Sequence, residues 1–215
     1  MLIYRMQKSR IKLQSNIPVI LANGIFPKHD KCLNIIKNAK ILICTDGSIN
    51  QLNSLPKKPT YIIGDLDSID KSKTFDCKII HDKSQDNTDL EKAIEWIYSE
   101  GYRDVIILGA TGMREDMSLI NQFLVFKYFK KINITIITDH FTISCMEGEE
   151  EIDSFENQLV SLIPENRSVV SSKGLEFELD KTNITIDGKN ISNRSKKDIF
   201  KIVSSEKLLV FQSHE

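Results

Sequence analysis

Short apolar runs alternate with amphipathic stretches from about Pro18 to about Asp139. Each run is a few residues long and is bounded by Gly, Asp or Asn, a pattern typical of buried strands in a mostly parallel sheet that helices cover. The pattern therefore predicts an N-terminal α/β domain. Its expected strands are residues 19–22, 41–45, 61–64, 78–81, 105–109 and 134–138.

Two of the amphipathic stretches have the hydrophobic spacing of helices. The clearer one begins at Thr88, whose hydroxyl can cap the first turn while Glu91 reaches back, and it ends before Gly101. A second helix is predicted from about Met117 to Phe129. The positions expected to face the sheet are Leu90, Ala93, Ile94, Ile97 and Tyr98 in the first helix, and Ile120, Phe123, Leu124, Phe126 and Phe129 in the second.

The pattern changes after the acidic stretch of residues 147–151. Beyond it, short alternating segments separated by turn residues predict an antiparallel β-unit. The expected strands are residues 159–163, 175–179, 184–186, 199–203 and 208–211. We therefore predict two domains, residues 1–147 and residues 148–215, with the boundary near Gly148.

Composition and charge restrict the classes of function. Apolar residues make up 40% and charged residues 27% of the 215 residues, which is typical of a globular protein in solution. The net charge of −1 offers no field that would attract nucleic acid or an anionic membrane. No signal peptide or membrane span is expected, so a cytoplasmic location is predicted. The four cysteines contain no CxxC pair and the four histidines are scattered, which argues against zinc and disulfides.

Polar residues follow three of the predicted strands directly. Residues 46–48 follow the second strand, residues 64–68 the third and residues 109–112 the fifth. Ligands of open α/β sheets bind outside the carboxyl ends of the strands, so these residues are expected at one edge of the sheet. This edge is where the chemistry of the protein is predicted.

Two aspartates after the third strand form a DxD motif. Asp65 and Asp67 flank Leu66, so in an extended segment their side chains would project to the same side and could share Mg²⁺. In the alternative, one carboxylate caps a turn and the other is solvated. A DxD motif alone does not decide between the two.

A third acidic group lies at the start of the clearer helix. Residues 86–89 precede or open its first turn, where backbone N–H groups and the helix dipole favour phosphate. Asp89 and Lys92 are three residues apart and therefore share a face of the helix. In the alternative, Asp89 only complements the dipole and Lys92 is a solvated side chain.

A turn with two glycines, residues 109–112, leads into Arg114 and Asp116. Glycines allow phosphate to approach the backbone, and a guanidinium group can hold two phosphate oxygens. The turn matches neither the Walker A pattern nor the dinucleotide fingerprint. A simple tight connection from strand to helix is therefore the alternative.

Taken together and in this order, residues 46–48, 64–68, 86–93 and 109–116 resemble the thiamine pyrophosphokinase family. The resemblance extends through Asn121 and into the second domain, at residues 160–164, 173–179 and 191–193. It covers most of the chain beyond about Pro18. The chain departs from the family's common residues at Ser48, Gln51, Met113, Met117 and Phe177, where the family commonly has Gly, Arg, Gly, a polar residue and, in some members, Trp.

The resemblance implies that the enzyme transfers the diphosphate group of ATP to the hydroxyl of thiamine, giving thiamine diphosphate and AMP. It also implies an ATP-binding α/β domain, a C-terminal thiamine-binding β-sandwich, and a homodimer whose active sites use both subunits. Mg²⁺ would be held by Asp65, Asp67 and Asp89, which are also catalytic together with Lys92, Arg114 and Asp116. ATP would contact Asp46, Gly47, Asp86, Thr88, Lys92, Gly109, Thr111, Gly112 and Arg114, and thiamine would contact Phe177, Ser192 and Asn193.

Two other functions stay open on the sequence. A nucleotide-sugar glycosyltransferase also holds a metal and a diphosphate with a DxD motif, but it leaves residues 86–92 and 109–116 unexplained. A non-catalytic thiamine- or nucleotide-binding module is the other alternative. The charged positions are all retained, which argues against such a module, whereas binding without turnover would establish it.

Overall fold

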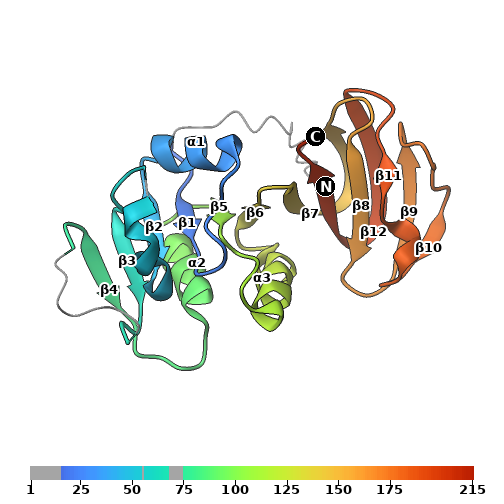
Figure 1. The fold of residues 1–215 in the computed structure, drawn as a ribbon. Helices are drawn as coiled ribbons and strands as arrows, with labels where there is room; N and C mark the ends of the chain where they lie inside the picture. Colours follow the sequence, from blue (N-terminus) through green and yellow to red (C-terminus); the bar gives the residue numbers. More distant parts are fainter. Residues whose placement is uncertain (1–15, 55, 68–74) are drawn as a thin grey trace. The chain divides into compact units, whose positions relative to one another are not determined.

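The computed structural model describes residues 16–54, 56–67 and 75–215, and the chain divides into two compact units between Asp139 and His140 (Figure 1). The boundary predicted near Gly148 lies instead inside strand β7 (Phe141–Asp153). There the exposed Glu149 and the half-buried Glu150 alternate along the strand and pair with Val203 and Ile202. A run of acidic residues resembles a linker in sequence, but here it is part of a paired strand.

The described part of the first unit contains six strands, and every pairing among them is parallel. They are hydrogen-bonded in the order β6–β5–β1–β2–β3–β4. The chain thus steps outward from β1 to β4 and then returns to the other side of β1, which makes a switch point between β1 and β5. The strands are β1 (Val19–Leu21), β2 (Leu42–Thr45), β3 (Tyr61–Gly64), β4 (Lys78–His81), β5 (Asp104–Leu108) and β6 (Asn133–Ile137).

Three α-helices and a 3-10 helix connect these strands, which confirms the predicted mixed α/β class. They are α1 (Asp30–Asn38), η1 (Asp46–Ser54), α2 (Asp89–Ser99) and α3 (Glu115–Tyr128). As predicted, Thr88 caps α2, because its Oγ1 accepts the N–H of Glu91 at 3.3 Å. The carboxylate of Glu91 does not reach back to Thr88, since it pairs with Lys127 and lies 2.9 Å from the hydroxyl oxygen of Tyr128.

The buried face of α3 differs from the prediction. Ile120 and Phe123, both expected to face the sheet, are 45% and 42% exposed. The buried face contains Asn121, Leu124 and other residues at positions 125, 126 and 128. Two residues of this face, Asn121 and Tyr128, form hydrogen bonds to Ala110 and Glu91, which apolar spacing does not predict. Among the described residues, no helix is both long and apolar enough to cross a membrane.

The second unit is antiparallel throughout its strand pairings. Strand β12 pairs with β7 along one edge and with β8 and β9 along the other, while β10 pairs with β9 and β11 with β8. Apolar residues of β7, β8, β9 and β12 form its core. Besides β7, the strands of this unit are β8 (Leu159–Pro164), β9 (Ser168–Lys173), β10 (Thr182–Ile184), β11 (Asn193–Arg194) and β12 (Ile199–Ser213).

Two predicted features of this unit were wrong. Residues 199–203 and 208–211 form the single strand β12, whose register shifts between Ser204 and Leu208. The polar residues between them form a bulge and not a turn, because the buried Ser204 hydroxyl lies 2.8 Å from the hydroxyl of Ser168. The strand expected at residues 175–179 is only an isolated bridge from Leu175 to Ser195.

Candidate active site

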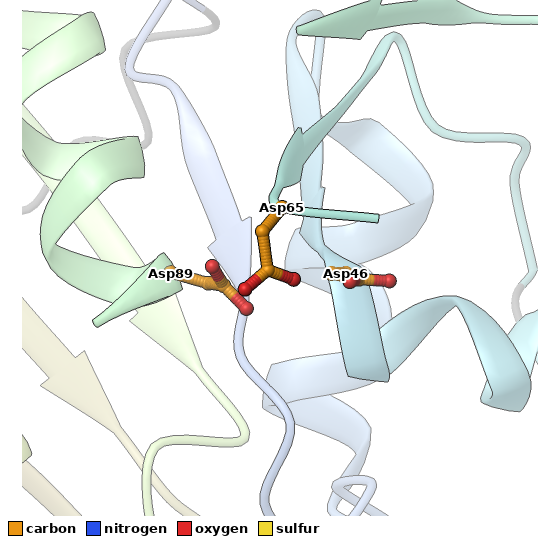
Figure 2. Close-up of side chains that lie close together, drawn as sticks. All are labelled: Asp46, Asp65 and Asp89. Carbon is orange, nitrogen blue, oxygen red and sulfur yellow. The ribbon is translucent and has the colours of Figure 1, made fainter. Parts of the chain in front are cut away.

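Three carboxylates meet at the carboxyl edge of the parallel sheet. Asp46 begins η1 after β2, Asp65 follows β3, and Asp89 begins α2. Each offers one oxygen, and these oxygens all lie within 4.8 Å of one another. Figure 2 shows the Asp65 carboxylate between those of Asp89 and Asp46, with each side chain coming from a different element. Asp46 is fully buried. We call these residues the carboxylate group.

Gly64, directly before Asp65, leaves the space that the carboxylate group occupies. A Cβ atom built on Gly64 would lie 2.5 Å from Cβ of Asp46 and 3.1 Å from Cγ of Asp89. Real Cβ atoms do not come so close to neighbouring atoms, so any side chain at this position would displace one carboxylate or both. The glycine therefore belongs to the site although it carries no chemistry of its own.

Asp67 is not one of the three residues of the carboxylate group, but its side chain interacts with that of Asp65. The backbone of Leu66 is left-handed, with φ of 65°, so the segment turns here instead of extending. The N–H of Asp67 donates to Asp65 Oδ1 at 3.3 Å, and Gln85 donates to Asp65 Oδ2 at 3.1 Å. These hydrogen bonds, the one from Gln85 above all, hold the pKa of Asp65 below its usual value. Asp46, which the predicted metal ligands did not include, is the third residue whose carboxylate oxygen lies within 4.8 Å of those of Asp65 and Asp89.

Lys92 is buried beside the carboxylate group, so the alternative of a solvated lysine is wrong. Its side chain is 3% exposed. Its Nζ donates to Asp89 Oδ1 at 3.2 Å and to the carbonyl oxygen of Asp82 at 3.2 Å. Burial raises the pKa of Asp89, and the opposing effect of Lys92 is smaller. The first turn of α2 therefore holds a positive and a negative charge in fixed positions.

Asp86 and Thr88, both predicted to contact ATP, occupy the loop before α2. The hydroxyl of Thr88 is engaged as the helix cap, and the N–H of Asp86 donates to Ser84 Oγ at 3.2 Å. Asp86 is exposed. Gly47 lies in η1, where it packs against the side chain of Asn23. The contacts of these residues with ATP stay predictions.

The glycine turn, residues 109–112, connects β5 to α3 through left-handed backbone. Gly109 has φ of 64° and Gly112 has φ of 80°. A Cβ on Gly109 would lie 2.7 Å from the carbonyl oxygen of Ala22. These conformations and this close approach both favour glycine. Thr111 lies between the two glycines and is partly exposed.

Asn23 and Gly24, which follow β1 at the switch point, were not among the residues predicted from the sequence. The N–H of Gly24 donates to the carbonyl oxygen of Gly109 at 2.7 Å, and Ile25 donates to that of Thr111 at 2.9 Å. The loop after β1 is thus hydrogen-bonded to the glycine turn. The signal was available, because an Asn-Gly pair follows the first predicted strand just as polar residues follow the others.

Arg114 precedes α3 and forms a two-point ion pair with Asp116. Nη2 of Arg114 lies 2.6 Å from Asp116 Oδ2, and Nε lies 3.1 Å from Oδ1. The pair raises the pKa of Arg114 and lowers that of Asp116, chiefly through these hydrogen bonds. Both side chains are mostly exposed. Asp116 thus orients the guanidinium group.

In the second unit, Asn193 and Phe177 are joined by hydrogen bonds. Nδ2 of Asn193 donates to the carbonyl oxygen of Phe177 at 2.7 Å, and Oδ1 accepts the N–H groups of Phe177 and Arg194 at 3.0 and 2.8 Å. Phe177 is 67% exposed and is therefore not part of the core. Ser192 has left-handed backbone, with φ of 63°, and its N–H donates to Ser161 Oγ at 3.0 Å.

Comparisons with known proteins point to one family. Residues 32–137 match the family model "Thiamin pyrophosphokinase, catalytic domain". A curated relative from Caenorhabditis elegans, "Thiamin pyrophosphokinase 1", is 28% identical over 177 residues, which are 74% of this chain and 72% of that protein. Residues 32–137, which match the family model, include the carboxylate group, Lys92 and Arg114.

Solved structures show the same fold. Yeast thiamin pyrophosphokinase aligns with a TM-score of 0.80 at 16% identity, over 93% of this chain and 86% of that chain. Thiamine pyrophosphokinase from Bacillus subtilis aligns with a TM-score of 0.76 at 23% identity, over 93% of this chain and 100% of that chain. Both alignments cover nearly the whole length of this chain.

Proposed function

We propose that the chain is a member of the thiamine pyrophosphokinase family, which it resembles in sequence and fold, and that it transfers the diphosphate group of ATP to the hydroxyl of thiamine, with AMP as the second product. The observation that carries the proposal is the carboxylate group, which lies beside the buried Lys92 at the edge of the sheet where α/β proteins bind ligands. It lies inside the segment that matches the family's catalytic domain.

The residues of the carboxylate group fit Mg²⁺. They offer only hard oxygen ligands, which Mg²⁺ prefers, and their oxygens lie within 4.8 Å of one another. Like charges so close repel one another, and a divalent cation would relieve that repulsion. We propose Asp46, Asp65 and Asp89 as the residues that hold the ion. When bound, Mg²⁺ would neutralise negative charge on the phosphate oxygens of ATP.

The remaining polar residues have distinct proposed roles. Lys92 keeps Asp89 in position and adds positive charge next to it. Arg114, oriented by Asp116, binds phosphate oxygens, and the glycine turn admits the phosphate chain to the backbone. Asp67 stands outside the carboxylate group, so we propose that its carboxylate accepts the proton of the thiamine hydroxyl as this oxygen attacks the β-phosphorus.

In the second unit we propose the thiamine site. The exposed ring of Phe177 offers a flat apolar face, and aromatic faces attract cations such as the thiazolium of thiamine. The antiparallel pairings are compatible with the two-layer sandwich that the family resemblance implies. The same proposal includes a cytoplasmic homodimer whose active sites use both subunits. The exposed Ile120 and Phe123 on α3 offer an apolar surface for contact between the subunits.

Incubation of the purified protein with ATP, Mg²⁺ and thiamine tests the proposal directly. Thiamine diphosphate and AMP should form in equal amounts, and chelation of Mg²⁺ should stop both. Release of ADP would mean that a single phosphoryl group is transferred and would contradict the proposal. Binding of both substrates without any product would indicate a binding module instead.

A further inference from the structure

Two side chains of α3 reach back to the glycine turn that precedes the helix. Asn121 donates from Nδ2 to the carbonyl oxygen of Ala110 at 2.8 Å. Ser118 accepts the N–H of Gly112 on its Oγ at 2.9 Å and donates to the carbonyl oxygen of Arg114 at 2.8 Å. The two residues are three positions apart, so they lie on the same face of the helix. One turn of α3 thus holds the carbonyl group of Ala110 and the N–H group of Gly112.

Asn121 occupies its position at an energetic disadvantage. The side chain is 6% exposed, and its Oδ1 is buried with no hydrogen-bond partner in the part of the chain that the structure describes. A buried acceptor without a partner destabilises a protein, whereas an apolar residue of similar size would not. The opposite orientation of the amide would set Oδ1 against the carbonyl oxygen of Ala110. The donor function toward Ala110 is therefore what distinguishes asparagine from leucine here.

The other carbonyl oxygens of the glycine turn are engaged as well. Gly109 accepts from Gly24 at 2.7 Å, Thr111 accepts from Ile25 at 2.9 Å, and Gly112 accepts from the N–H of Arg114 at 2.8 Å. Together with the bond from Asn121 to Ala110, every carbonyl of residues 109–112 is directed at a protein donor. A carbonyl oxygen that faced an anion would repel it, so this arrangement removes the repulsive groups from the path of a phosphate.

We propose that Ser118 and Asn121 are positioning residues for the nucleotide: they fix the glycine turn in the conformation that accepts the phosphate chain of ATP. The inference rests on the proposed function, in which this turn receives ATP. Without the Asn121 donor, the peptide between Ala110 and Thr111 can rotate and present its oxygen to the phosphates. Without the Ser118 hydroxyl, the N–H of Gly112 loses its partner.

The test compares matched variants of the full chain. Asn121→Asp keeps the size of the side chain but exchanges the donor for an acceptor. Asn38→Asp is its control, because the Asn38 amide also donates to a backbone carbonyl, that of Asn34, at 2.8 Å. Ser118→Ala removes the hydroxyl, and Ser118→Thr restores it. The measurements are the Kd of Mg²⁺–ATP by calorimetry, the KM for each substrate and the melting temperature.

Asn121→Asp and Ser118→Ala are each expected to raise the Kd and the KM for ATP about 10-fold, the effect of one lost hydrogen bond, and to leave the KM for thiamine within about 2-fold. Ser118→Thr and Asn38→Asp should behave like the unchanged protein. A fall in melting temperature with unchanged ATP affinity would overturn the inference, as would an equal rise of both KM values. If Asn121→Asp does not fold, the two Ser118 variants decide the question.

The proposed function and this inference fail in different ways. If the unchanged protein binds Mg²⁺–ATP but forms no thiamine diphosphate, the proposed reaction is wrong. A weaker Kd for ATP in the Asn121→Asp and Ser118→Ala variants would still support the positioning role in that case, and an unchanged Kd would overturn it.

Discussion

The carboxylate group of the first unit and the Phe177–Asn193 pair of the second unit arrange their polar atoms in opposite ways. In the first, three like charges from separate elements converge, and burial raises the pKa of Asp89. In the second, the amide of Asn193 makes three hydrogen bonds to the backbone of Phe177 and Arg194. The proposed cation would add to the first arrangement, where Lys92 already pairs with Asp89, whereas the polar atoms of the second bind to the chain itself.

This difference separates two kinds of functional residue. Carboxylates that converge in a partly buried site favour the binding of a cation. A satisfied hydrogen-bond network indicates that the residue acts through what it holds in place, here the exposed ring of Phe177. Asn193 is therefore expected to act through Phe177, while Asp65 acts through its own charge.

The largest effect is expected for Asp65→Asn. The change removes one charge from the carboxylate group while it keeps the shape of the side chain, so turnover should fall at least about 100-fold and the requirement for Mg²⁺ should rise. Initial rates of AMP formation across a Mg²⁺ titration measure both.

Asp67→Asn tests whether the Mg²⁺ requirement depends on the carboxylate group alone. Since Asp67 lies outside the group, Asp67→Asn should lower the turnover number but leave the Mg²⁺ requirement unchanged. Asp76→Asn, an exposed aspartate paired with Lys58 at 3.1 Å, is the control and should retain activity. An equal rise of the Mg²⁺ requirement in the Asp65 and Asp67 variants would show that both residues hold the ion.

Gly64→Ala should disturb the carboxylate group without changing its charge. The added methyl group would collide with Asp46 and approach Asp89, so we expect turnover to fall about 10-fold and the protein to lose about 1–3 kcal/mol of stability. Activity assays and thermal melts test this. Gly188→Ala is the control, because a Cβ at Gly188 meets no atom within 4 Å. Full activity of the Gly64 variant would mean that the close approach is irrelevant to the site.

A smaller and more selective effect is expected for Asn193→Ala. The KM for thiamine should rise several-fold because the backbone of Phe177 loses the amide that holds it, while the KM for ATP stays nearly constant. Steady-state kinetics with each substrate varied in turn measure the difference. Phe177→Ala should raise the same KM, and the double variant should be no worse than Phe177→Ala alone. Additive effects would indicate that Asn193 binds thiamine independently of Phe177.

The smallest effect is expected for Glu150, a half-buried carboxyl group for which no bound cation is proposed. Burial raises its pKa, so the stability linked to this carboxyl is fully present below its ordinary pKa of 4.5 and is lost as the pH rises through the raised value. Glu150→Gln should therefore raise the melting temperature by about 1 °C at neutral pH and have no such effect below pH 4.5.

Thermal melts across this pH range test the Glu150 prediction. Glu147→Gln, an exposed position on the same strand, should leave the melting temperature unchanged at every pH. A stabilisation by Glu150→Gln that persists in acid would show that packing, and not charge, is responsible. The raised pKa of Glu150 would then not explain its effect on stability.

The amino-acid sequence predicted the first unit closely because local signals there agree with the fold. Strands β3 and β4 begin and end at the predicted residues, and Thr88 caps α2 as expected. The sequence could not show that Leu66 adopts a left-handed backbone, so that the segment from Asp65 to Asp67 turns instead of extending. The inclusion of Asp46 as a third member likewise depends on how β2 and β3 lie in space.

The second unit was harder to predict because long-range pairing overrides its local pattern. The serines and charged residues between positions 203 and 208 look like a turn, but their hydroxyl contacts with Ser168 keep them within one bulged strand. The acidic residues of β7 similarly look like a linker until their pairing with β12 is known. The hydrogen bonds of Asn193 to Phe177 join positions 16 residues apart, which no local pattern indicates.

Strand β12 also has a consequence for the order in which the two units can fold during synthesis. Strands β7, β8 and β9 all precede β12 and all pair with it, so each must wait for a segment that the ribosome delivers later. The six parallel strands of the first unit are complete at residue 137, before any of this begins. During synthesis, the α/β unit can therefore fold while the β-unit still exposes unpaired strand edges. It is in this interval that the nascent chain most needs protection from aggregation.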